Sequence, residues 1–181
     1  MKSLQNASMY AFAACIISIA VSLGCYYAGL FQSWLNYLSY VAFIVMMVMA
    51  VNAWKNTNYN GFITYGKALG HATYGALVFS VFMSVWAFIF FEYIAHDEIL
   101  KLQAVEMGKQ AVIMKEKYGM SDDQIKQSLD MAKKFTTGGA IALFALIGNM
   151  FLLTIINLIL AAILKKDDPS LDTFDSTSGT V

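Results

Sequence analysis

The chain has 181 residues, of which 59% are hydrophobic and only 13% charged, and its mean hydropathy is +0.58. Soluble domains carry about 25% charged residues, so this chain lacks the polar coat that a water-soluble fold needs. The formal net charge is zero and every basic residue is a lysine, which gives no signal for nucleic acid and no guanidinium for bidentate phosphate recognition.

Four segments are each long enough to cross a bilayer as a helix, which takes about 20 apolar residues. In chain order they are residues 9–30, 34–54, 68–95 and 138–164. No strand-like alternation competes with them over a comparable length. Backbone groups in lipid must be hydrogen-bonded internally, which a helix achieves. The sequence therefore predicts an all-α membrane protein with four transmembrane helices.

The first segment could alternatively be a cleaved signal. The stretch VSLGC, which ends at Cys25, is loosely similar to a lipoprotein cleavage box, but Ser22 stands where a leucine is expected. The apolar run is longer than a signal core, and a second span follows almost at once. We expect a retained helix, on which Cys15 and Cys25 lie about 15 Å apart, too far for a disulfide.

A row of small residues enters the third span at helical spacing. It begins with the motif GKALG, and small residues let helices approach closely in lipid. We expect this row to be the seam of the helix bundle: Gly66, Gly70, Ala72, Ala76, Ser80 and Ser84.

Polar residues within the spans allow two interpretations. His71 lies one turn after Lys67, and Asn149 and Asn157 are eight residues apart, so they point the same way on the fourth span. In lipid such side chains usually hydrogen-bond across helices. The alternative is a polar route lined by His71, Asn149 and Asn157. Glu92, a carboxylate at the end of the third span, is expected at the membrane interface.

The hydrophilic stretch 96–137 is predicted to form two amphipathic helices. A stripe at spacings of three and four contains Leu100, Met107, Met114 and Tyr118. Either the two helices cover this stripe by packing on each other or on the membrane surface, or it binds a partner protein, for which methionine is well suited.

Local signals fix the ends of these two helices. Gly119 is a typical helix stop, and Ser121 with Gln124 forms a capping box. His96 with the adjacent acidic residues is interpreted as a solvated helix start. The organisation expected is three spans in 1–95, the helical pair in 96–137, the fourth span in 138–166 and a disordered tail in 167–181.

Lysine placement gives opposing signals for orientation. With a cytoplasmic N-terminus the lysines at 2, 55, 67, 165 and 166 lie inside, but the seven lysines of the helical pair lie outside. Counting lysines alone favours the opposite orientation. Because the first helix usually dominates, and the first hairpin carries lysines on one side only, we expect both termini in the cytoplasm.

No catalytic, cofactor-binding or metal-binding pattern is visible in the sequence. It contains no Gly-rich phosphate loop, no HExxH and no Ser/His/Asp constellation. No charge occupies the middle of a span and no Gly/Pro break interrupts one, although carriers commonly have such features. We therefore expect a protein that is not an enzyme and has no cofactor or metal.

Two stretches resemble a known family. These are GFITYGKALGHATYGALVFSVFMSVWAFIFFEYI at the third span and MGKQAVIMKEKYGMSDDQIKQSLDMAKKF before the fourth. They are similar to the bacterial membrane proteins of the domain-of-unknown-function family DUF4199, and the resemblance covers roughly residues 1–166. It implies a multi-pass protein of the bacterial inner membrane and no particular activity.

Two functions are consistent with these observations. The first is an accessory or scaffold subunit that acts through helix packing and its extramembrane helices, with a membrane or periplasmic protein, or a second copy of the chain, as partner. The alternative is a small transporter or channel component that uses the polar route. An intramembrane enzyme is a third hypothesis.

Overall fold

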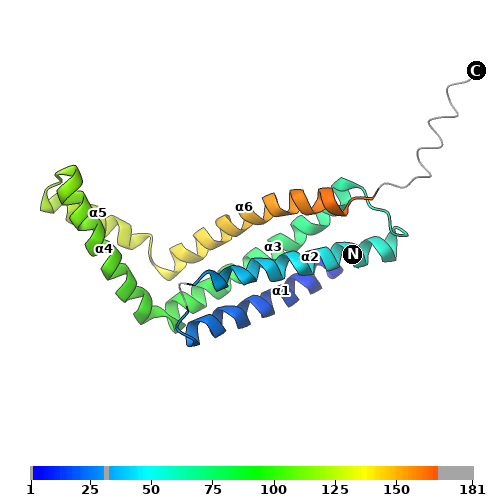
Figure 1. Cartoon of the computed structure of the whole chain (residues 1–181), viewed down its shortest axis with the longest axis horizontal. Helices are drawn as coiled ribbons and strands as arrows, with labels where there is room; N and C mark the ends of the chain where they lie inside the picture. The colour runs from blue at the N-terminus through cyan, green and yellow to red at the C-terminus, as the bar shows by residue number, and fades with distance from the viewer. Residues whose placement is uncertain (1, 31–32, 167–181) are drawn as a thin grey trace, which may run out of the picture. The chain divides into compact units, whose positions relative to one another are not determined.

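A computed structural model describes residues 2–30 and 33–166; the tail predicted to be disordered lies outside these residues. The elements in chain order are α1 (Lys2–Tyr27), a 3₁₀ helix η1 (Trp34–Tyr37), α2 (Leu38–Asn58), α3 (Tyr65–Ile89), a π-helix η2 (Phe90–Ile94), α4 (His96–Tyr118), α5 (Asp122–Lys134) and α6 (Gly138–Leu164) (Figure 1). They form two compact units. We call Met1–Phe82 with Asn149–Val181 the bundle unit, and Met83–Gly148 the hairpin unit.

Four helices in the described residues are long and apolar enough to cross a membrane, which confirms the predicted all-α membrane fold. These spans are Leu4–Tyr27, Leu38–Asn58, Tyr65–Ile94 and Gly138–Leu164. The last has the predicted bounds. The first begins earlier than predicted because the polar residues before Met9 continue the helix, and the second begins later because η1 precedes it.

The bundle unit is built on close contact between α1, α2 and α3. Gly75 of α3 faces the side chain of Met47 in α2, and a Cβ atom on Gly75 would overlap the Met47 sulfur. The backbone oxygen of Ala7 in α1 lies 3.8 Å from the same position. One turn away, the rings of Phe43 and Phe79 pack with their centroids 4.9 Å apart. A glycine at this level is what allows three helices to meet.

One end of the bundle unit is closed by backbone pairing. Ile63, in the connection between α2 and α3, exchanges two hydrogen bonds of 2.9 Å with Lys166, just after α6. Ile63 is buried in a cluster with Val51, Ala72 and Ala161, which come from α2, α3 and α6. The end of α6 therefore lies beside the α2–α3 connection.

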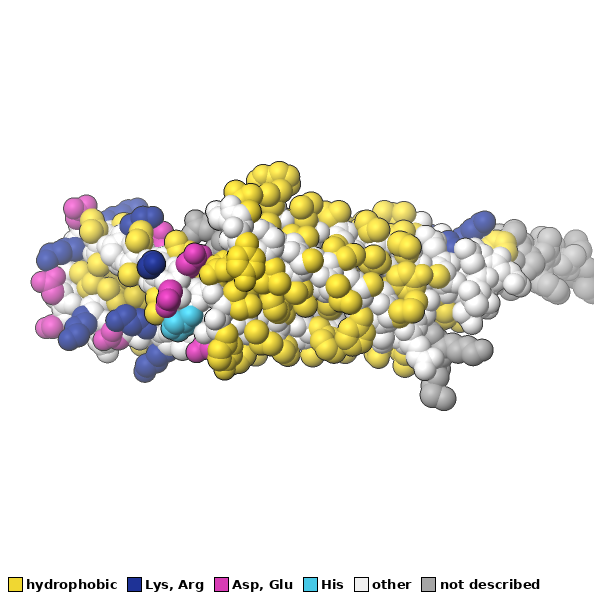
Figure 2. All heavy atoms as spheres, turned by 90° about the horizontal axis from the view of Figure 1, so that it is seen from below, with side chains coloured by type: hydrophobic (Ala, Val, Ile, Leu, Met, Phe, Trp, Pro, Cys, Tyr) yellow, Lys and Arg dark blue, Asp and Glu magenta, His cyan; other side chains and the backbone are white. Residues whose placement is uncertain are grey.

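The outward faces of the bundle helices are apolar. Large side chains such as Ile16, Val45 and Ile159 are exposed, whereas inward positions carry mainly alanine and other small residues. Figure 2 shows apolar side chains covering these helices on one face, whereas acidic side chains and most of the lysines gather on α4 and α5. This distribution suits lipid around the spans and water around the α4–α5 pair.

The hairpin unit contains α4 and α5 as an ordered helical hairpin. Gly119 ends α4 in a left-handed conformation with φ of 61°, as predicted for this glycine. The predicted capping box is present at the start of α5, where Ser121 and Gln124 bond to each other's backbone N–H. Lys115 and Asp122 form an ion pair of 2.7 Å across the connection. The hairpin is thus defined by local interactions at its turn.

Replacement of Gly75 tests the close approach of the helices. We expect Gly75→Ala to lower the thermal midpoint of the detergent-purified protein, because overpacking a buried site costs about 1–3 kcal/mol. Gly70→Ala is the matched control, since Gly70 is exposed and nothing lies within 4 Å of its Cβ position. Equal effects of the two substitutions would contradict this packing.

Candidate functional site

Polar side chains of the bundle unit pair across helices. In α3, His71 Nε2 lies 3.1 Å from Asn6 Oδ1 of α1, and the His71 ring stacks on Trp54 of α2 with centroids 4.4 Å apart. In α6, the Oδ1 of Asn149 accepts a hydrogen bond of 2.8 Å from the hydroxyl of Tyr40 in α2. Each pair connects two helices, which is the common role of polar groups in lipid.

Asn157 differs from these residues. Its side chain is 0% exposed, and neither amide atom has a hydrogen-bond partner among the described residues. Asn149 lies two turns earlier on α6, about 12 Å away at 1.5 Å per residue. His71, Asn149 and Asn157 therefore share no hydrogen-bond partner, and the polar route remains a prediction.

The predicted seam of small residues is divided between two sides of α3. Ala72, Ala76 and Ser80 are buried, and Ser84 is half-buried. In contrast, Gly66 and Gly70 are exposed, with nothing within 4 Å of their Cβ positions. The reason is geometric: consecutive helix residues turn by about 100°, so Gly70 and Ala72 point about 200° apart. The buried row instead continues backwards to Ala68.

The predicted partner stripe on α4 is also divided. Met107 and Met114 are half-buried, whereas Leu100 and Tyr118 are 50% and 67% exposed. Helices α4 and α5 contact each other, and Met107 lines a pocket together with Lys133 of α5. The two methionines thus lie on the side of α4 that faces α5, which reduces the surface they offer to a partner.

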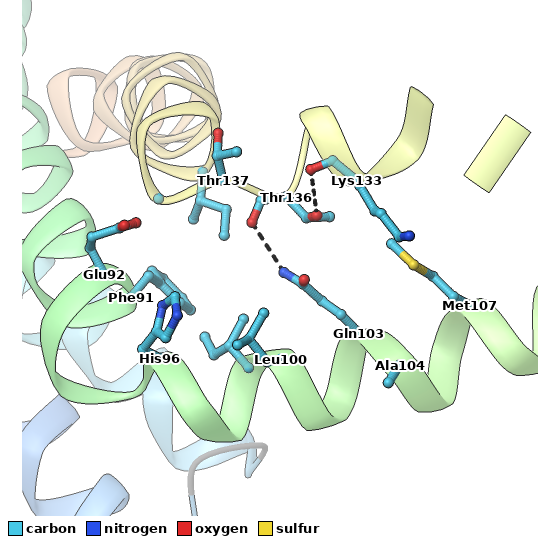
Figure 3. A pocket seen from close by; sticks show the side chains of 13 residues that line it. Phe91, Glu92, His96, Leu100, Gln103, Ala104, Met107, Lys133, Thr136 and Thr137 are labelled. Carbon is cyan, nitrogen blue, oxygen red and sulfur yellow. Dashed lines mark hydrogen bonds between the residues drawn. The ribbon is translucent and has the colours of Figure 1, made fainter. Parts of the chain in front are cut away.

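The hairpin unit contains a pocket of about 390 Å³ (Figure 3). Its residues come from η2, α4, the end of α5, the α5–α6 connection and the first turn of α6. They are Phe91, Glu92, His96, Ile99, Leu100, Gln103, Ala104, Met107, Lys133, Thr136, Thr137, Gly138 and Ile141. This volume falls within the range of about 300–1,000 Å³ typical of small-molecule sites.

The π-helix η2 carries the two pocket residues that come from the third span. Phe91 and Glu92 belong to this five-residue π-helix at the end of the span. The Glu92 carboxylate lies against Gly138, and a Cβ atom at position 138 would overlap it. Gly138 is the first residue of α6, and the start of a helix favours negative charge. A single turn of π-helix often marks a functional site.

The opposite wall of the pocket is held by a side-chain bridge between α4 and the segment before α6. Gln103 donates a hydrogen bond of 3.1 Å from Nε2 to the carbonyl of Thr136. Thr137 Oγ1 accepts one of 3.3 Å from the N–H of Ala140 and so caps α6. Figure 3 shows the side chains of Glu92, His96 and Gln103 directed toward the same space.

Glu92 is predicted from the sequence to be interfacial and His96 to belong to a solvated helix start, so the sequence does not predict this pocket. A signal was present, because Glu92 and His96 are four residues apart and the pair of glycines at 138 and 139 begins the next span. The π-helix could not be predicted from the sequence. It changes the direction in which Phe91 and Glu92 leave the helix axis, compared with a continuation of α3. In the part of the chain that the structure describes, no group of three or more histidine, cysteine or acidic residues is arranged to hold a metal.

Comparisons with known proteins identify a family. The family described as "Protein of unknown function (DUF4199)" matches residues 9–166, which is most of the chain and includes both units. No curated protein and no solved structure matches the chain.

The two asparagines of α6 should respond oppositely to substitution. Asn149→Leu removes the acceptor of the Tyr40 hydroxyl and should lower the thermal midpoint, since such bonds contribute about 0.6–1.7 kcal/mol in membranes. Asn157→Leu removes an amide that has no hydrogen-bond partner among the described residues, and it should leave the midpoint unchanged or raise it. Thermal unfolding in one detergent compares them. A larger loss for Asn157→Leu than for Asn149→Leu would show that Asn157 supports the fold.

Proposed function

We propose that this chain, which belongs to the DUF4199 family, is an accessory or scaffold subunit of the bacterial inner membrane that binds another protein through its α4–α5 hairpin. The observation that carries the proposal is an ordered hairpin outside the spans that exposes large apolar side chains. The proposed role is not enzymatic and uses no cofactor.

The exposed apolar side chains lie on both helices of the hairpin. On α4, Val105 and Val112 are 55% and 53% exposed, and they are seven residues apart on one face. On α5, Met131 and Phe135 are also exposed. Charged residues surround them, including Lys109 in its ion pair with Glu106. Apolar groups with a polar rim are typical of surfaces that bind proteins.

The arrangement of the bundle unit supports a structural rather than a catalytic role. His71 and Asn149 are engaged with neighbouring helices, and α3 packs closely through Gly75. No lysine or carboxylate lies within the middle of a span in the sequence. These features are typical of a closely packed helix bundle and not of a transport pathway. They support the subunit proposal over the transporter alternative.

The proposed orientation has both termini in the cytoplasm and the hairpin on the outer side of the membrane. An even number of spans returns the chain to its starting side. The pairing of Ile63 with Lys166 supports one basic end, because it brings the region of Lys55 and Lys67 to the end of α6. Lys67 Nζ lies 4.3 Å from the centroid of the Tyr59 ring, as suits a lysine at an interface. Positive charge favours the cytoplasmic side.

The face of α4 that carries the exposed Val105 and Val112 is called the outer face of α4. A single charge placed on this face tests the proposal. We expect Val112→Glu to reduce recovery of the partner protein more than tenfold after affinity purification from the native host. An unpaired carboxylate in an apolar contact costs well over the ~1.4 kcal/mol that corresponds to tenfold in affinity. The matched control is Gln110→Glu, which adds the same charge at an exposed polar position two residues away.

Quantitative mass spectrometry of the purified samples provides the measurement. Wild-type recovery by both variants would refute binding through this face. Equal losses in both variants would also contradict the proposal, because they would indicate a general effect of negative charge. Met107→Glu is unsuitable as the test, since Met107 lies toward α5 and its replacement would disturb the hairpin itself.

A further inference from the structure

The pocket of the hairpin unit has no part in the proposed binding through the outer face of α4. Its lining combines an acidic group, a histidine and an amide with an apolar wall of Ile99, Leu100 and Ile141. The hairpin unit alone supplies all of these residues. A mainly apolar lining with a few polar groups suits a ligand that has a polar head and an apolar part.

The charged side chains of the lining indicate the sign of the charge that the ligand carries. Lys133 is ion-paired with Asp130 at 3.3 Å, and its side chain is 62% exposed, so its charge is matched outside the pocket. Glu92 has no ion pair or hydrogen bond to any described residue, although its side chain is half-buried. Among the described residues, the start of α6 lies beside this carboxylate and carries a partial positive charge of about half a unit. The pocket is therefore left with an excess of negative charge at Glu92.

An ammonium group is the chemistry that fits this position. A carboxylate that is half-buried gains most from a cation that also donates hydrogen bonds. The adjacent Phe91 lines the same space with an aromatic ring, and aromatic faces attract ammonium groups. An alkyl chain joined to the ammonium would lie against Leu100 and Ile141, and Glu92 stands at the end of a span, where amphiphiles have their headgroups.

We propose that this pocket binds the ammonium group of an amphiphile, with the Glu92 carboxylate as its anionic partner and the apolar wall in contact with its alkyl part. Two sources share this chemistry: a membrane phospholipid with an ammonium headgroup, and a water-soluble alkylammonium compound. Gly138 is a positioning residue, because only a residue without a Cβ atom leaves the Glu92 carboxylate its place beside α6.

Binding to the full-length protein in nanodiscs of phosphatidylglycerol tests the proposal. One arm adds phosphatidylethanolamine and measures its retention by native mass spectrometry. The other adds dodecylammonium, with dodecanoate as the probe of opposite charge. We expect wild-type protein to retain an ammonium amphiphile from at least one arm and to show no comparable affinity for dodecanoate; the arm that binds identifies the source. Retention in neither arm, or equal binding of dodecanoate, would overturn the proposal.

Two variants connect binding to the pocket. Glu92→Gln keeps the shape and should weaken ammonium binding about tenfold or more, as expected for a lost charge-assisted contact. Gly138→Ala keeps every polar group and should weaken binding by displacing the carboxylate. The matched control is Glu106→Gln, an exposed carboxylate on α4 outside the pocket, which should bind as wild type does. Wild-type affinity in Glu92→Gln, or an equal loss in Glu106→Gln, would assign the binding to something other than this pocket.

Discussion

Close contact between α1, α2 and α3 at Gly75 is the constraint on which the bundle unit depends. In lipid the hydrophobic effect does not hold helices together, so packing and hydrogen bonds must do so. Gly75 lets the Met47 side chain and the backbone of Ala7 approach one helix at the same level. The alanines of the inward faces extend this contact toward both ends, and large apolar side chains are left to face outward.

Polar groups add specificity to this packing. His71 is held between Asn6 and Trp54, and Tyr40 joins α2 to α6 through Asn149. These contacts fix the relative rotation of helices whose apolar surfaces alone would permit several arrangements. Asn157 stands apart as a buried amide that none of the described residues satisfies. A polar group retained in this way contributes little to stability, so it is the position in the bundle where a role beyond packing is easiest to justify.

The sequence predicts some parts of this structure well, for identifiable reasons. The length of an apolar run determines whether a helix can span a membrane, and the bounds of α6 follow from its glycines and the lysines after it. Gly119 and the Ser121–Gln124 capping box depend only on local chemistry, and both are present. It is harder to predict which side of a membrane helix packs against its neighbours. A helix in lipid is apolar all round, so hydrophobic periodicity does not separate the inward from the outward side. Gly66 and Gly70 are a different case, because the two-residue step from Gly70 to Ala72 already places them on another side of the helix.

The pocket in the hairpin unit could not be predicted because it depends on two features that hydropathy does not encode. One is the π-helix, which reorients Phe91 and Glu92 at the end of the third span. The other is contact between residues far apart in the chain, such as Glu92 with Gly138 and Gln103 with Thr136. Each of these residues, taken alone, can be explained by a structural role. A site is indicated only because their side chains line the same pocket.

The α4–α5 hairpin is proposed to join this membrane bundle to another protein. The most direct measurement is lysine cross-linking of the wild-type chain in its native host, followed by mass spectrometry of the linked peptides. We expect a reproducible, stoichiometric partner joined to Lys109, Lys115 or Lys126 of the hairpin. Cross-links between copies of this chain alone, or none from the hairpin lysines, would contradict an accessory role and favour a self-contained bundle that handles small molecules or lipids.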